Sequence, residues 1–86
     1  MQVVLYTTSH ACPLCDEARF HLDREREQTP FDLRVVTVDG DPRLAVRHAL
    51  RVPVIEIDGV EAMHGKIEPD ALRAALRARP SGARRP

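Results

Sequence analysis

Both cysteines of this 86-residue chain stand in one tetrapeptide, Cys12-Pro13-Leu14-Cys15, and the place of this motif constrains the fold more than any other segment. A short, apolar and β-branched run, typical of a buried strand, precedes it at residues 3–7. A segment with helical periodicity follows it. Pro13 suits the first position of that helix, which makes Cys12 the capping residue. The motif therefore marks the junction between a strand and a helix.

A cysteine at the start of a helix has unusual chemistry. Unpaired backbone N–H groups and the positive end of the helix dipole both favour the thiolate. Cysteines in Cys-X-X-Cys motifs accordingly have pKa values lowered from about 8.5 to roughly 3.5–7.5. The spacing also puts Cys15 within a turn of Cys12, so a disulfide can close between them. A reactive thiolate with a second thiol that displaces its adducts is the minimum requirement for dithiol–disulfide exchange.

The rest of the chain alternates short strands and helices. The helix after the motif is predicted to run to residue 27, before Thr29-Pro30, and its apolar residues recur every fourth position. These are Leu14, Ala18 and Leu22. Further strands are predicted at residues 33–38, 53–57 and 60–64, and further helices at 42–49 and 69–79. Asp58-Gly59 is a two-residue hairpin turn of the type that needs positive φ.

This order, β-α-β-α-β-β-α, predicts an α/β fold with three layers, α/β/α, around a four-stranded mixed sheet. Right-handed crossovers are expected to place the first two strands parallel to the third, and the hairpin adds an antiparallel edge. The first strand is then central, so the loop that carries Cys12 opens at the carboxyl ends of the strands. We expect a single domain over residues 1–79 and a disordered tail at 80–86.

Composition and charge exclude several classes of partner. The charged residues, 30% of the chain, cancel to a formal net charge of +0, so no global field attracts nucleic acid or an anionic membrane. No apolar run approaches the ~20 residues that span a bilayer, and the N-terminus shows no export signal. We expect a cytoplasmic monomer without nucleic-acid or membrane partners. In that compartment a Cys-X-X-Cys pair is more often catalytic or metal-binding than structural.

Two other roles for the cysteine pair stay open. Free cysteines are often buried as small hydrophobic side chains. A zinc site is the second alternative, although structural zinc usually has four protein ligands and only His10 and His64 could join the two thiols. We therefore assign no metal ligand. The histidines His21, His48 and His64 are interpreted as packing or surface residues.

The element order, the position of the motif and the segment Arg51-Val52-Pro53-Val54 before the hairpin together resemble the glutaredoxin-like branch of the thioredoxin superfamily. The resemblance covers residues 3–79 and implies a thioredoxin-like fold. It also implies that the peptide bond before Pro53 is cis, that Pro53 lies beside the active-site sulfurs, and that the backbone of Val52 pairs with the substrate. The predicted substrate-binding residues are Val52, Pro53, Arg51, Pro13 and Leu14.

The resemblance and the motif together predict a dithiol–disulfide oxidoreductase, in which Cys12 attacks and Cys15 resolves. We expect protein or small-molecule disulfides as substrates, a thiol reductant or reductase as partner, and no cofactor beyond the redox-active disulfide. Glutathione is a candidate co-substrate, with weak dependence, because His64-Gly65-Lys66 replaces the Gly-Gly and acidic pair of the family. The alternative functions are a redox-sensing or adaptor module with little turnover, or a metal-binding carrier.

Overall fold

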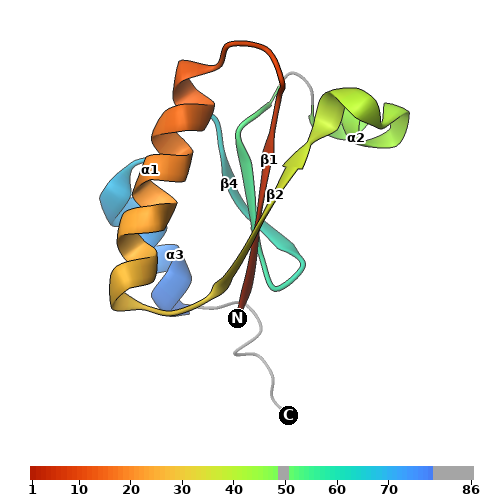
Figure 1. Cartoon of the computed structure of the whole chain (residues 1–86). Helices are drawn as coiled ribbons and strands as arrows, with labels where there is room; N and C mark the ends of the chain where they lie inside the picture. Colours follow the sequence, from red (N-terminus) through yellow and green to blue (C-terminus); the bar gives the residue numbers. More distant parts are fainter. Residues whose placement is uncertain (49–50, 79–86) are drawn as a thin grey trace.

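The computed structural model describes residues 1–48 and 51–78, which form one four-stranded sheet with helices on both sides (Figure 1). The elements in chain order are β1 (Gln2–Thr7), α1 (Pro13–Gln28), β2 (Asp32–Thr37), the 3-10 helix η1 (Val38–Gly40), α2 (Pro42–His48), β3 (Val54–Ile57), β4 (Val60–His64) and α3 (Pro69–Ala78). This order confirms the predicted one. The predicted ends of two helices, at residues 49 and 79, and the predicted tail at 80–86 lie outside the described residues.

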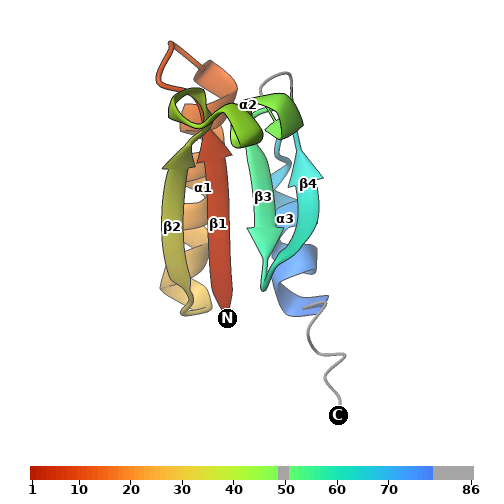
Figure 2. The same cartoon turned by 90° about the vertical axis from the view of Figure 1, so that its right-hand side faces the viewer.

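The helices make the two outer layers of the α/β/α arrangement. Helices α1 and α3 lie together on one face of the sheet, whereas α2 lies on the other side, across one end (Figures 1 and 2). None of the helices in the described part of the chain is long and apolar enough to cross a membrane.

The sheet has the strand order β2-β1-β3-β4, in which β1 pairs in parallel with β2 but antiparallel with β3. The prediction that the third strand runs parallel to the first two is therefore wrong. Helix α2 has seven residues and is about 10 Å long, while the six-residue β2 spans about 20 Å. The short helix cannot return the chain to the opposite end of the sheet. The chain therefore enters β3 from the end at which it left β2 (Figure 2).

The main core lies between the sheet and the pair α1 and α3. Its buried residues are Val3, Leu5, Ala18, Leu22, Phe31, Ile55, Ile57, Ile67, Leu72 and Leu76. On α1 the buried stripe begins at Cys15 and continues through Ala18 and Leu22 to Glu25. Leu14, which was predicted to share this face, is 40% exposed. Cys15 takes the inward position in the first turn, and this turns the neighbouring Leu14 outward.

A buried carboxylate joins the two helices of this layer. Glu25 on α1 is 6% exposed, and its carboxylate accepts hydrogen bonds from Arg73 Nε at 3.1 Å and Nη2 at 2.9 Å. The ion pair raises the pKa of Arg73 above its ordinary value. A buried charge is tolerated when it is paired and hydrogen-bonded, and this pair therefore fixes α3 against α1.

The hairpin between β3 and β4 has the predicted backbone. Asp58 and Gly59 take φ values of 51° and 86°, which a two-residue turn of type I′ requires. The Asp58 carboxylate accepts a hydrogen bond from the Gln2 backbone N–H at 2.8 Å. The turn is thus joined to the start of β1, at the end of the sheet away from the cysteine motif (Figure 1).

Candidate redox site

Three segments that are distant in the sequence meet at one end of the sheet. Tyr6 near the end of β1 pairs with Val54 at the start of β3, and Val54 pairs with His64 at the end of β4. The residues just outside these pairs belong to the loop that leads to Cys12, the segment 51–53 and the loop 65–67. The antiparallel pairing of β3, rather than the predicted parallel one, is what brings the segment 51–53 to this end.

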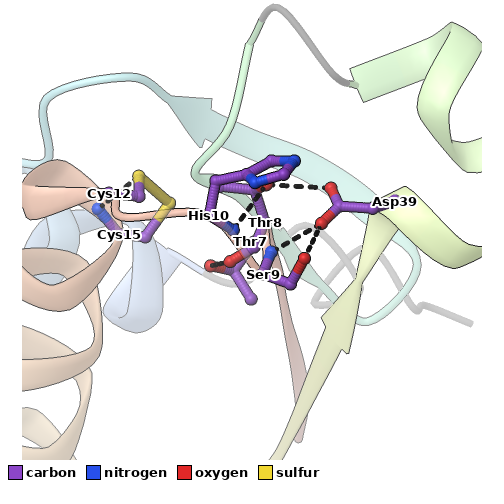
Figure 3. Close-up of a disulfide and its surroundings, with 7 residues drawn as sticks. All are labelled: Thr7, Thr8, Ser9, His10, Cys12, Cys15 and Asp39. Atoms are coloured by element: carbon purple, nitrogen blue, oxygen red, sulfur yellow. Dashed lines mark hydrogen bonds between the residues drawn. A yellow bond between two sulfur atoms is a disulfide. The ribbon is translucent and has the colours of Figure 1, made fainter.

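A disulfide joins Cys12 and Cys15, whose Cα atoms are 5.2 Å apart (Figure 3). Cys12 caps α1 and Pro13 opens it. The Cys15 backbone N–H donates a hydrogen bond to Cys12 Sγ at 3.1 Å. Cys12 is partly exposed, whereas Cys15 is 4% exposed. A reagent in solution therefore meets Cys12 first, between the exposed side chains of Pro13 and Leu14.

The segment before β3 contains the cis peptide bond that the resemblance implies, between Val52 and Pro53. Pro53 is buried, and its carbonyl accepts a hydrogen bond from the Gly65 backbone N–H at 2.8 Å. Gly65 has a φ of 76°, a conformation that glycine adopts without steric cost. The loop after β4 is thereby attached to the start of β3, and Val52 remains partly exposed at this end of the sheet.

Two cations at this end, Arg51 and Lys66, each have a carboxylate partner. Arg51 forms an ion pair with Glu61 on β4, and Lys66 Nζ lies 3.1 Å from Glu17 Oε1 on α1. Sequence reasoning singled out both cations but neither partner. The signal for Glu17 is its place in the first turns of α1, whereas nothing in the sequence around Glu61 on the edge strand β4 points to Arg51.

The loop before Cys12 is held by a residue that sequence reasoning missed. Asp39, in the 3-10 helix after β2, accepts hydrogen bonds from the Ser9 backbone N–H at 2.7 Å, from the Thr8 hydroxyl at 2.8 Å and from the Ser9 hydroxyl (Figure 3). The Thr8 hydroxyl also accepts the His10 backbone N–H at 3.2 Å. These bonds, the one from the Ser9 hydroxyl first, lower the pKa of Asp39 to about 2. The loop is thus tied to the end of the neighbouring strand.

Helix α2 is fixed to β1 by ring stacking. The His48 ring is 2% exposed and stacks on Tyr6, with the ring centroids 4.5 Å apart. Neither His48 ring nitrogen has a hydrogen-bond partner in the described part of the chain. The Tyr6 hydroxyl donates to Glu56 Oε1 at 3.2 Å, and burial, together with the charge of Glu56, raises the pKa of Tyr6. His48 is therefore a packing residue, as predicted.

The described residues offer no arrangement typical of a metal centre. No group of three or more His, Cys, Asp or Glu side chains among residues 1–48 and 51–78 is placed to hold a metal ion. His10 and His64, which were considered as partners of the thiols in a zinc site, are both exposed.

Comparison with known structures defines the class of the fold. The structure resembles that of a structural-genomics target protein from X. campestris, with a TM-score of 0.78 and 33% identity over 91% of this chain and 99% of the other. It also resembles a mutant thioredoxin from Halobacterium salinarum, with a TM-score of 0.67 and 23% identity over 91% of this chain and 73% of that one. The fold is thus thioredoxin-like.

The sequence itself gives the family. The model of the glutaredoxin-like domain (DUF836) matches residues 2–77, which is nearly the whole described chain. The protein belongs to this family of glutaredoxin-like domains. No curated protein matches the sequence.

Proposed function

We propose that the protein is a dithiol–disulfide oxidoreductase that reacts through Cys12 and Cys15. In the reduced form the Cys12 thiolate attacks one sulfur of a substrate disulfide, and the other substrate sulfur leaves as a thiolate. The Cys15 thiolate then attacks Cys12 Sγ and releases the second substrate thiol. The protein loses two electrons and gains the Cys12–Cys15 disulfide, while the substrate disulfide becomes two thiols. A thiol reductant or a reductase reverses the change.

The difference between the two cysteines supports these roles. Cys12 is the accessible one, at the helix cap, and its sulfur accepts the Cys15 backbone N–H. In the reduced form the same N–H and the helix dipole favour negative charge on Cys12. Cys15 is buried, which suits a thiol that reacts only with an adduct already formed one turn away.

Protein disulfides fit this site better than glutathione as the main substrate. Arg51 and Lys66, the cations that could hold the glutathione carboxylates, are already paired with Glu61 and Glu17. Glutathione must compete with these carboxylates, so glutathione-dependent turnover is expected to be weak. A partly exposed Val52 before the buried Pro53 leaves backbone groups at the end of the sheet for an extended substrate peptide.

Trapping of the mixed disulfide tests this function. The Cys15→Ser variant is expected to accumulate a covalent adduct on Cys12 when mixed with a disulfide substrate, since no second thiol resolves it. The Cys12→Ser variant serves as the matched control and should form no such adduct at a comparable rate. Intact mass spectrometry and turnover of insulin with dithiothreitol measure the two effects. Adducts on Cys15, or adducts without turnover in the parent protein, would favour a sensor or adaptor instead.

A further inference from the structure

Some of the acidic side chains at the disulfide end of the sheet take no part in an ion pair. Lys66 is neutralised by Glu17, and Arg51 by Glu61. Two acidic side chains at this end of the sheet, Asp16 and Asp39, form no ion pair within the described residues. Asp39 holds the loop before Cys12 and is ionised at neutral pH, since its pKa is about 2. Neither carboxylate is therefore neutralised by an ion pair.

Asp16 is the acid nearest to the reactive sulfur along the helix. Its backbone N–H donates to the Cys12 carbonyl at 3.0 Å, so it lies about one helical turn after Cys12, about 6 Å further along the axis. Residues four apart share one side of a helix. The Asp16 side chain is exposed and forms no hydrogen bond or ion pair within the described residues. A substrate bound to Cys12 therefore meets an unpaired carboxylate.

Two sources of positive charge oppose this carboxylate. The start of α1 carries a helix-dipole charge of about +0.5, which is smaller than the full negative charge of Asp16. The second source is α2, which carries Arg43 and Arg47. This helix lies on the other side of the sheet from α1 (Figure 1), and no ion pair joins either arginine to Asp16.

We propose, on the basis of the function proposed above, that Asp16 makes this site select disulfides flanked by positive charge and disfavour anionic disulfides such as glutathione disulfide. The selection acts on the first exchange step, when the Cys12 thiolate approaches the substrate sulfur and the substrate charges come within one turn of Asp16. One unpaired surface charge at such a distance changes a rate by about two- to fourfold for each substrate charge that approaches it at low ionic strength.

The test compares three disulfides of similar size and different charge. These are cystamine, which is a dication, bis(hydroxyethyl) disulfide, which is neutral, and dithiodipropionate, which is a dianion. For each disulfide, the rate constant for oxidation of the reduced protein is divided by the rate constant for oxidation of dithiothreitol. This division corrects for the intrinsic reactivity of the disulfide. The protein should prefer cystamine over dithiodipropionate, and added salt should reduce the preference. Asp16→Asn should lower the cystamine-to-dithiodipropionate ratio about fivefold.

Two matched variants separate the charge of Asp16 from other effects of the substitution. Asp16→Glu keeps the charge and should keep the ratio. Glu27→Gln removes an exposed charge near the far end of α1 and should leave the ratio unchanged. Because the ratio compares substrates within one variant, an altered Cys12 pKa cancels from it. A parent ratio equal to that of dithiothreitol, or one unaffected by Asp16→Asn, would overturn the proposal while reaction with the neutral disulfide still supports the oxidoreductase. No reaction with any of the three would overturn both.

Discussion

The Asp39 carboxylate accepts both the backbone N–H and the hydroxyl of Ser9, so the end of β2 holds the loop that delivers Cys12 to the helix cap. All three residues between β1 and Ala11 take part in this network: Thr8 and Ser9 donate to Asp39, and His10 donates to the Thr8 hydroxyl. Cys12 follows this loop after a single residue. The position of Cys12 therefore depends on the side chain of Asp39, which follows the end of the neighbouring strand β2.

Loss of the Asp39 carboxylate should free this loop. In Asp39→Asn the amide offers one acceptor oxygen in place of two, so Ser9 and Thr8 compete for it. We expect faster hydrogen exchange of the Ser9 backbone amide, because its hydrogen bond is weakened. We also expect Cys12 to react severalfold more slowly with a neutral disulfide, because a misplaced thiol reacts more slowly. Asp41→Asn, in the next turn of the chain, is the control. Unchanged exchange at Ser9 would contradict the role of Asp39.

The same carboxylate gives a pH dependence with a defined sign. The pKa of Asp39 falls from 3.8 to about 2 on folding, so its contribution to stability is complete at neutral pH. As the pH falls below about 4 the unfolded state takes up the proton first, and the contribution disappears as the pH approaches 2. Thermal unfolding should show Asp39→Asn less stable than the parent at neutral pH, with the difference shrinking over this acidic range. A stability difference between the two proteins that stays constant down to pH 2 would show that the Asp39 charge is not its cause.

Glutathione turnover should be low and should depend little on Lys66. The Lys66 ammonium group is half-exposed and already paired with Glu17, and exposed ion pairs contribute only about 0–1 kcal/mol. In a coupled assay with glutathione and glutathione reductase, Lys66→Ala should change turnover by less than about fivefold. Arg77→Ala, on the exposed side of α3, is the control for lost positive charge. Fast turnover that Lys66→Ala abolishes would mean that Lys66 binds the glutathione carboxylate after all.

Leu22 should be a principal determinant of stability. It is fully buried in the core beneath α1, and Leu→Ala changes at such sites cost about 2–5 kcal/mol. Phe20 on the same helix is 55% exposed, so Phe20→Ala should cost much less. Urea unfolding of the oxidised proteins measures the free energy of unfolding of both variants. Equal decreases in this free energy for the two substitutions would contradict the burial pattern of α1.

The Glu25–Arg73 pair should show strong coupling in a double-mutant cycle. Arg73→Met leaves the Glu25 carboxylate buried without its partner, and an unpaired buried charge is more destabilising than a missing pair. The double variant Glu25→Gln with Arg73→Met should therefore be more stable than Arg73→Met alone. Additive effects in urea unfolding would show that the two side chains act independently.

Much of this fold can be predicted from local sequence signals. Pro13 after Cys12 indicates the start of α1, Asp58-Gly59 indicates a two-residue hairpin, and both features are present in the structure. The direction of β3 was predicted wrongly, because the crossover rule assumes a connecting helix that runs back along the sheet. The helix predicted at residues 42–49 is itself too short to run back along the sheet, and its length indicates the antiparallel arrangement.

The candidate site also has a part that local sequence predicts and a part that it does not. The cysteine pair and its position at the helix cap follow from a motif of four consecutive residues. The partners of the site come from other strands and helices: Asp39 holds Ser9, and Glu17 pairs with Lys66. Such contacts depend on tertiary placement, and an acidic residue after a strand is too common in sequences to single out. The substrate charge preference proposed for the site depends on these contacts.

The direction of β1 separates the reactive end of the molecule from its first residue. The strand starts next to Met1 and carries the chain about 20 Å toward the cysteine loop over its six residues, so the N-terminus lies at the opposite end of the sheet from the disulfide (Figure 1). A fluorescent protein or a second redox domain fused at Met1 would thus sit away from Cys12. The domain is suited to use as a tethered module, in which the thiols stay open to their substrate while the other end is attached to a reporter.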